Sequence, residues 1–173
     1  HVREVCKELL DVVLESSDTE PPKALALQRA IELLEGDVPN EKLTLSQSLS
    51  DSYKVKGKNV SIGCNTGDII NERQYESLHL TEKVLYKPTN NNKYEGPSIK
   101  DINQAHVQVV RKMRERQPGS EPQSGDRVPY ILVKTEDPKA KAFEKSEDPK
   151  YVSENNVPID YEYYFMNKFI NPV

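Results

Sequence analysis

The stretch QAHVQVVRKMRERQPGSEPQSGDRVPYILVK, residues 104–134, contains a helix pattern, a turn-rich loop and a strand pattern in direct succession. The helix pattern begins at Ser98, because SIKD (98–101) is a capping sequence, and we expect a helix over about 99–116. Its buried stripe consists of Ile102, Ala105, His106, Val109 and Met113. The cations of its C-terminal turns, which also complement the helix dipole, are Arg111, Lys112, Arg114 and Arg116.

The residues after this helix predict a loop and then a strand. QPGSEPQSGD (117–126) is rich in turn formers, and RVPYILVK (127–134) is rich in β-formers. Pro129 has no N–H group for a sheet ladder, so we expect this strand to lie at a sheet edge.

Two helices are expected near the start of the chain. Apolar residues at three- and four-residue spacing predict an amphipathic helix over about 2–15, with Cys6 on its stripe as a buried free thiol. The prolines at 21–22 can only open a second helix, which Gly36 ends as a C-cap. The short connection makes the two helices antiparallel.

The next two segments differ in character. KLTLSQSL (42–49) has leucines at alternate positions and predicts a short strand or extended arm. Residues 52–98 contain KGKN, GCNTGD and PTNNNKYEGP, with apolar residues in short runs only. We expect a loop-rich insertion with one or two β-hairpins and mobile tips, and we favour solvated loop over a specific site.

Two short helices are expected near the end of the chain. SEDPKYVSEN (146–155) supplies an N-cap and an early proline for the first. Asp160 can cap the second, and Pro172 stands at its end. The helix patterns outnumber the strand patterns, so we expect an α+β fold that is mainly α, divided as 1–51, 52–98 and 99–173.

Charge is unevenly distributed. The chain of 173 residues has 24 basic and 28 acidic residues and a net charge of -4. Residues 1–51 have 5 basic and 11 acidic residues, whereas residues 100–134 have 7 basic and 4 acidic ones. A basic stretch in an acidic protein is either a phosphate footprint or ordinary mixed surface charge.

Several classes of site and of protein are not supported. The two cysteines and three histidines form no zinc pattern, and no nucleotide-binding, hydrolase or metalloprotease motif occurs. The close carboxylate pairs, which we interpret as solvated surface, are Asp18/Glu20, Glu136/Asp137 and Glu147/Asp148. Cys64 is expected to be an exposed thiol, and without a disulfide framework, a signal peptide or a membrane span we expect an intracellular protein in a reducing compartment. A helix pattern that starts at His1 without an N-cap suggests a piece cut from a longer chain.

Two blocks carry a family resemblance. QAHVQVVRKMRERQPGSEPQSGDRVPY (104–130) and KSEDPKYVSENNVPIDYEYY (145–164) resemble the thumb region of family-B replicative DNA polymerases of the delta-like branch. The segments VREVCKELLDVVLE (2–15) and ALQRAIELLEGDVPNEKLTLSQSLSDSYK (26–54) resemble the helical entry to the same thumb. In that family the SL–x–x–YK segment runs into the QAH helix after a few residues, whereas here about 45 residues intervene.

The resemblance implies a thumb-type helical module with short strands and a hairpin insertion. It implies that the parent is a DNA-directed DNA polymerase that uses Mg²⁺ and dNTP, and that this piece holds primer–template duplex DNA without being active alone. A protein that binds duplex DNA of any sequence needs Lys and Arg side chains against the phosphates. Small residues beside them allow the protein backbone to approach the phosphates closely. The residues expected to bind DNA are Lys54, Arg111, Lys112, Arg114, Arg116, Gly119, Ser120, Ser124, Gly125, Arg127 and Lys134.

Some of these residues have structural alternatives. Arg127 is as well explained by a salt bridge with Asp126, and His106 by a core position with a hydrogen-bond partner. The tyrosines, which we expect to pack rather than to stack on bases, are Tyr130, Tyr151, Tyr161, Tyr163 and Tyr164. Further phosphate contacts are expected at Lys145, Lys150 and Lys168.

Function at a coarser level has an alternative as well. The acidic first third and the Asn-rich insertion also fit a non-enzymatic protein-interaction module. A delta-like polymerase implies a sliding clamp as partner, although no clamp-binding motif is visible. The insertion fits a large DNA virus as well as a protist or another eukaryote, so the nucleus and a cytoplasmic viral replication site both remain open.

Overall fold

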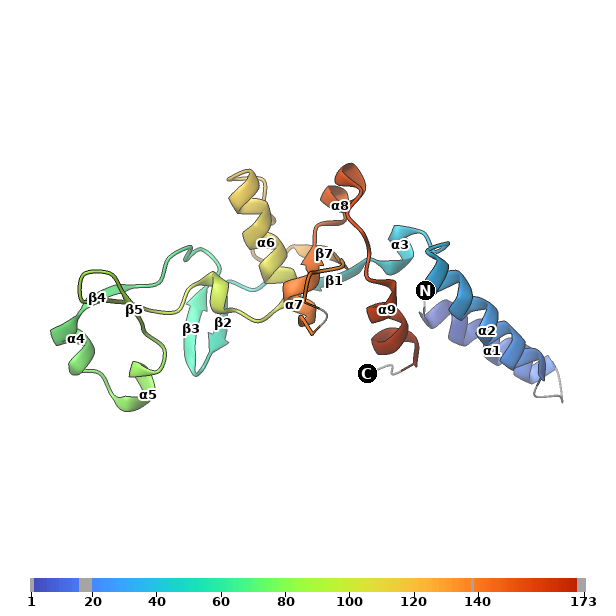
Figure 1. Ribbon diagram of the computed structural model, residues 1–173, viewed down its shortest axis with the longest axis horizontal. Coiled ribbons are helices and arrows are strands. Elements are labelled where there is room, and N and C mark those ends of the chain that lie inside the picture. Colours follow the sequence, from blue (N-terminus) through green and yellow to red (C-terminus); the bar gives the residue numbers. More distant parts are fainter. Residues whose placement is uncertain (1, 16–19, 138, 171–173) are drawn as a thin grey trace. The chain divides into compact units, whose positions relative to one another are not determined.

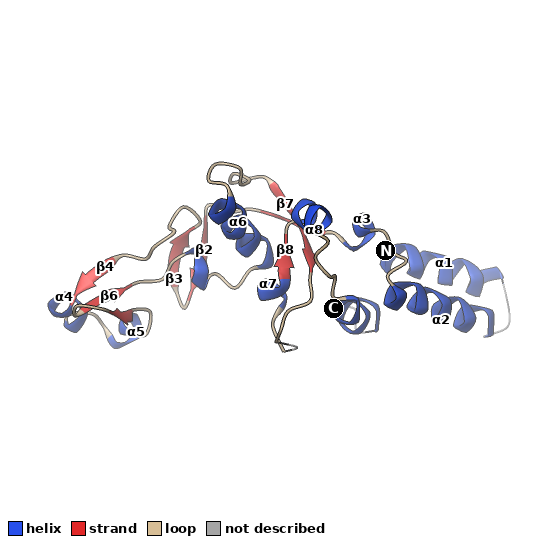
Figure 2. Cartoon of the chain, turned by 45° about the horizontal axis from the view of Figure 1, so that its top comes forward, coloured by secondary structure: helices blue, strands red, loops and turns tan. Residues whose placement is uncertain are grey.

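The computed structural model describes residues 2–15, 20–137 and 139–170, which form two compact units. Unit 1 draws on His1–Leu45, Ile131–Lys139 and Pro149–Val173, and unit 2 on Ser46–Tyr130 and Ala140–Asp148. Groups of helices and groups of short strands follow one another along the chain, as Figures 1 and 2 show. The fold is therefore α+β, as the sequence predicts.

Unit 1 begins with a helical hairpin of α1 (Val2–Glu15) and α2 (Glu20–Glu35), which pack side by side (Figure 1). α2 begins one residue before the proline pair and ends at Gly36, whose φ of 83° is a left-handed C-cap. Arg29 crosses the hairpin to Glu8, with 2.8 Å between Nη2 and Oε2. Both predicted helices are confirmed.

The prediction of a buried Cys6 is wrong, because its side chain is exposed. The buried residue of this turn is its neighbour Val5, at 4% exposure. α1 packs mainly against α2, so only a narrow seam of its apolar stripe is covered. Leu10 and Val13 of that stripe are 62% and 52% exposed.

A further part of unit 1 comes from the end of the chain. α8 (Pro149–Asn155) begins at its proline, and α9 (Tyr161–Tyr164) continues into a π-helical segment, η2 (Phe165–Ile170). Asp160 caps α9, since its Oδ1 accepts a hydrogen bond from the Tyr163 amide at 3.0 Å. These two predictions are confirmed, whereas Pro172 and Asp18 lie outside the described residues.

Residues 42–49 are only partly extended. α3 (Asn40–Leu43) takes the first positions, and β1 (Leu45–Ser48) follows. A three-stranded sheet has the order β1–β7–β8, with β7 at Arg127–Leu132 and β8 at Ser146–Glu147. The edge position expected from Pro129 is therefore wrong, because β7 is the central strand. β8 is only two residues long, so it cannot pair along all of β7, and a residue without an N–H group is tolerated.

In unit 2, the insertion forms two small sheets. β2 (Ser52–Val55) and β3 (Lys58–Ser61) form an antiparallel hairpin. β4 (Ile69–Asn71), β6 (Lys93–Glu95) and β5 (Lys87–Thr89) form a second sheet in that order, with the short helices α4 (Glu72–Glu76) and α5 (Leu80–Lys83) (Figure 2). The expected hairpins are confirmed, and the helices are an addition.

The predicted helix over 99–116 begins later than expected. A single 3₁₀ turn, η1 (Ile99–Asp101), is followed by extended residues, and α6 spans Ala105–Arg116. The Gln108 side chain donates to the carbonyl oxygens of Ile99 and Ile102, at 3.0 and 2.7 Å. These bonds satisfy the carbonyl groups that a continuous helix would have paired. A last short helix, α7 (Ala142–Lys145), precedes β8.

The centre of unit 2 is the first half of α6. Val107, Val109 and Val110 are completely buried, and His106 and Gln108 are nearly so. The buried surface differs from the predicted stripe, because it includes Val107, Gln108 and Val110, whereas Ala105 and Met113 are only half-buried. α6 is thus a fixed support for the charged residues of its last turns. No helix in the described ranges is both long and apolar enough to cross a bilayer.

Candidate nucleic-acid interface

The four cations of α6 all have partners inside unit 2. Arg111 binds the carboxylate of Glu115 one turn later, at 2.7 and 2.9 Å, and its Nε donates to Gln108 Oε1 at 2.7 Å. A paired arginine has less charge to offer to phosphate. The helix therefore presents a mixed surface at this position.

Lys112 and Arg116 share one buried carboxylate, Glu147. Arg116 Nη2 lies 2.7 Å from Glu147 Oε2, and Lys112 Nζ lies 3.6 Å from the same oxygen and donates to the Ser146 carbonyl at 2.6 Å. Burial raises the pKa of Glu147, but its bonds to Arg116 and to the Asp148 amide outweigh burial and lower the pKa overall. Burial also lowers the pKa of Lys112.

Arg114 connects α6 to the loop that follows it. Its Nε donates to Glu121 Oε1 at 2.7 Å, and Glu121 Oε2 accepts the Gly119 amide at 2.8 Å. The bond from Arg114 lowers the pKa of Glu121, so this carboxylate stays charged. Nη1 of Arg114 also donates to the Ile62 carbonyl and to Asn65 Oδ1, both at 2.7 Å. One guanidinium therefore holds the loop and the insertion to the same helix.

The loop over 117–126 has two left-handed glycines. Gly119 has φ 88° and Gly125 has φ 93°, and no atom lies within 4 Å of the position that a Cβ would take at either. Their amides are used inside the protein, however, since Gly125 donates to the Leu49 carbonyl at 2.8 Å. Ser120 Oγ donates to the Gln117 carbonyl at 2.7 Å, whereas Ser124 is exposed. The loop surface is open to close approach.

Two further residues that were predicted to bind DNA, Arg127 and Lys134, follow this loop in the chain. Arg127 contacts Ser46, with its Nη2 3.1 Å from Oγ, and Asp126 accepts the Gln123 amide. The alternative of an Arg127–Asp126 salt bridge is not found among the described residues. Lys134 is exposed and belongs to unit 1. Its backbone amide donates to the Pro158 carbonyl at 2.8 Å.

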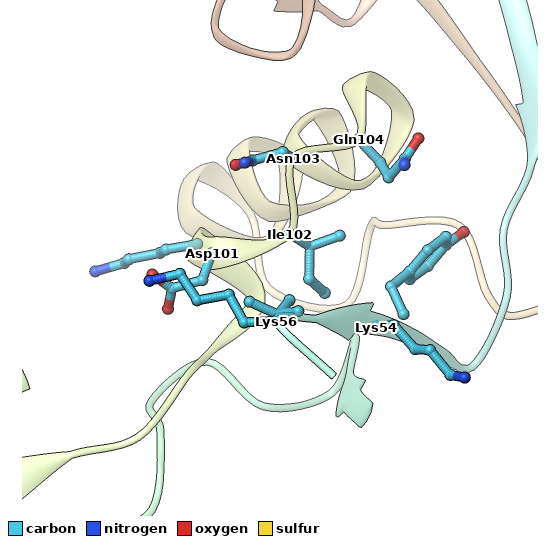
Figure 3. Close-up of a pocket in the computed structure, with 9 residues that line it drawn as sticks. Lys54, Lys56, Asp101, Ile102, Asn103 and Gln104 are labelled. Carbon is cyan, nitrogen blue, oxygen red and sulfur yellow. The ribbon is translucent and has the colours of Figure 1, made fainter. Parts of the chain in front are cut away.

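Lys54 lies on β2 at a groove of about 550 Å³. The residues around this groove come from the β2–β3 hairpin and from the segment before α6: Tyr53, Lys54, Val55, Lys56, Lys100, Asp101, Ile102, Asn103 and Gln104. Figure 3 shows Lys54 and Lys56 extending in opposite directions, with Asn103 and Gln104 across the hollow. Within the described part of the chain, no ion pair involves Lys54, Lys56 or Lys100.

One hydrogen bond holds this groove to α6. The Tyr53 hydroxyl lies 2.7 Å from His106 Nε2 and also accepts the Ser50 amide at 2.9 Å. His106 is 4% exposed, which confirms its predicted core position. Its Nδ1 is buried without a partner among the described residues, and burial lowers the pKa of the imidazole.

Burial and exposure test the predictions for Lys145, for the close carboxylate pairs and for Cys64. Lys145 is 4% exposed, so an outer phosphate contact there is wrong. Glu147 is 6% exposed, so the solvated reading of that carboxylate is wrong, whereas Glu136 and Asp137 are exposed as expected. The expected exposed thiol at Cys64 is confirmed.

The tyrosine predictions are largely supported by burial. Tyr130 and Tyr164 are buried, at 9% and 3% exposure, which confirms them as packing residues. The half-buried ones are Tyr151, Tyr161 and Tyr163. Lys150 is exposed near Glu154, and Lys168 is half-buried.

Sequence reasoning missed the groove residues other than Lys54. Lys56 stands in KVKGKN, where Lys-Gly between two short β patterns was a hairpin-turn signal. Lys100, Asn103 and Gln104 carried no comparable signal, because they were assigned to a continuous helix. Glu121 and Glu147 were missed as partners, since nothing in sequence spacing shows which carboxylate meets which arginine.

Comparison with known proteins identifies the family. The model of DNA polymerase family B matches residues 1–173, which is the whole chain. The chain belongs to DNA polymerase family B. It is similar to the DNA polymerase delta catalytic subunits of Glycine max (47% identity over 73 residues, 42% of this chain and 7% of the relative) and Candida albicans (41% over 96 residues, 56% and 8%).

A longer similarity extends to the nematode protein. The DNA polymerase delta catalytic subunit of Caenorhabditis elegans is 33% identical over 134 residues, which cover 77% of this chain and 11% of that protein. The chain thus spans only about a tenth of the length of these relatives. The delta-like family assignment made from the sequence is confirmed.

Proposed function

We propose that this chain is the thumb of a replicative family-B DNA polymerase and holds primer–template duplex by its phosphates. The family match and the name shared by the relatives support a DNA polymerase as the complete protein. The complete polymerase would supply template-directed synthesis, and a sliding clamp would bind it outside the residues discussed here.

Catalysis is assigned to other parts of that polymerase. Nucleotidyl transfer needs clustered carboxylates to hold Mg²⁺. In the ranges that the structure describes, no group of three or more His, Cys, Asp or Glu side chains could hold a metal ion. Mg²⁺ and dNTP therefore belong outside the described residues in this proposal.

The observation that carries the proposal is the position of Lys54. It is exposed on β2, its ammonium group has no carboxylate partner among the described residues, and it lines a groove bordered by Asn103 and Gln104. An unpaired lysine beside two amides suits a phosphate, because the lysine supplies charge and the amides donate hydrogen bonds without reading a base. Lys54 is thus the leading direct contact.

The other predicted DNA-binding residues receive two kinds of role. Direct contacts with phosphate are proposed for the exposed residues Arg127, Ser124 and Lys134. The small residues Gly119, Ser120 and Gly125 are proposed to let the DNA backbone approach the loop closely. The cations of α6 are proposed to act mainly by position, since each already holds a carboxylate or carbonyl group: Arg111, Lys112, Arg114 and Arg116.

The test compares Lys54→Gln with Lys93→Gln, a change of the same charge at an exposed lysine that does not line the groove. Binding of random-sequence duplex DNA to the chain is measured by fluorescence anisotropy over a range of salt concentrations. We expect Lys54→Gln to reduce the magnitude of the log–log salt slope by about 0.9, the value for one phosphate contact. Equal slopes for both variants would remove Lys54 from the interface.

A further inference from the structure

Lys56 occupies a position that lysine rarely takes. The register Val55↔Lys58 leaves Lys56 and Gly57 as a two-residue turn, with φ 47° and 91°. Two positive φ values define a type I′ turn, in which Asn or Gly is favoured at the first position. A lysine there is strained, and such strain is concentrated at functional sites.

Lys100 brings a second unpaired charge to the same groove. It lies in η1, is exposed, and precedes Asp101, whose carboxylate also lines the groove. Asp101 is already bound by Lys87, with 2.6 Å between Nζ and Oδ1. Burial raises the pKa of Asp101, but the bonds from Lys87 and the Ser98 amide lower it overall. The negative charge of Asp101 is therefore neutralised by Lys87, which does not line the groove.

We propose that Lys56 and Lys100 form an additional binding site for the sugar–phosphate backbone of DNA, built by the insertion beside Lys54. The inference rests on the proposed function and extends it, because the insertion lengthens the stretch of backbone that the chain contacts. The hairpin supplies Lys56, and η1 supplies Lys100 at the point where the insertion returns to α6.

The geometry favours a chain of phosphates over one small anion. Lys54 and Lys56 extend away from each other and do not converge on one point of the groove (Figure 3). Lysines spread along a groove suit successive phosphates of one strand. Asn103 and Gln104 can donate to the oxygens between them. The Tyr53 hydroxyl is held by His106 and Ser50, which leaves the groove to the lysines and amides.

The experiment uses the chain with Lys56→Asn, Lys100→Gln and the double variant, and Lys93→Gln as control. Asn is compatible with the left-handed turn, so Lys56→Asn removes the charge while preserving the hairpin. Thermal unfolding verifies that each variant is folded. Binding to random-sequence duplex is then measured against salt, with inorganic phosphate and polyglutamate as competitors.

We expect each single variant to reduce the magnitude of the salt slope by about 0.9 and the double variant by about 1.8. Lys93→Gln should leave it unchanged, and inorganic phosphate should compete only weakly. If Lys54→Gln flattens the slope and the Lys56 and Lys100 variants do not, this site is rejected while the proposed function stands. If the unaltered chain binds no duplex, both fall. Lysine-dependent binding that is tighter to polyglutamate than to duplex would assign the groove to an acidic polypeptide and overturn the inference.

Discussion

Arg114 and Glu121 form a partly buried ion pair, with Nε 2.7 Å from Oε1, that joins the last turns of α6 to the loop over 117–126. Because the same carboxylate accepts a hydrogen bond from the Gly119 amide, Arg114 holds the loop in place through Glu121. Sequence alone suggested that Arg114 faces phosphate. The structure gives it an internal partner that a sequence pattern could not identify.

This pair can be tested with Arg114→Lys. Lysine keeps the charge but not the planar fork that reaches Glu121, Ile62 and Asn65 together. We expect a loss of about 1–3 kcal/mol in the free energy of unfolding and faster hydrogen exchange at the Gly119 amide. Arg127→Lys, at an exposed arginine, is the control. Unchanged exchange at Gly119 would contradict the positioning role.

Glu147 should contribute measurably to stability. Glu147→Gln leaves Arg116 and Lys112 without their shared carboxylate, and we expect a cost of about 2 kcal/mol, moderated because Arg116 keeps access to water. Chemical denaturation measures the change. Glu136→Gln, at an exposed carboxylate, should cost less than about 0.5 kcal/mol. Similar losses for the two variants would show that the buried pair is not special.

His106 predicts a pH dependence of stability. Burial holds its folded pKa below the ordinary value of 6.5, so the unfolded chain takes up a proton first as the pH falls. The free energy of unfolding should therefore decrease below about pH 6.5, by up to about 1.4 kcal/mol per pH unit, until the folded pKa is reached.

The controls separate this effect from those of other groups. His106→Gln should remove the slope between the ordinary histidine range and the carboxylate range, while His79→Gln, at an exposed histidine, should not. The lowered pKa of Glu147 acts at lower pH, where stability is lost as the pH falls below about 4.5. A slope that survives His106→Gln would refute the assignment.

The loop glycines allow a test of backbone strain. Gly125→Ala places a Cβ at φ 93°, where a non-glycine residue is disfavoured although the surrounding space is open. We expect a cost of about 1–2 kcal/mol from conformation alone. Gly63→Ala is the matched control, because Gly63 has no positive φ and its Cβ would meet only Ser61 Oγ, at 3.5 Å. Equal melting temperatures would mean that the loop adapts.

Local signals predicted much of the fold. The spacing of apolar residues, the proline pair in the first turn of α2 and Gly36 after the helix placed the helical hairpin, and Asp160 placed the cap of α9. Tertiary contacts decided the failures. Cys6 is exposed because α1 packs mainly on α2, and α6 starts at Ala105 because Gln108 binds the carbonyl groups of the preceding turn.

The candidate site was harder to predict than the fold. The sequence pointed to the cations of α6 because they are close together in the chain, but closeness in sequence does not reveal the carboxylates that neutralise them. The unpaired lysines lie in segments that are about 45 residues apart and meet only through the hairpin, as Lys54 and Lys100 do. Tyr53, which lines their shared groove, is bound to His106 of α6, a contact that no spacing rule predicts.

The most direct measurement is a cryo-electron microscopy structure of the complete polymerase bound to primer–template duplex. We expect Lys54 Nζ to lie within ion-pair distance of a backbone phosphate oxygen, with Lys56 and Lys100 beside neighbouring phosphates of the same strand. A structure in which this groove faces solvent or another protein surface, away from the nucleic acid, would contradict it.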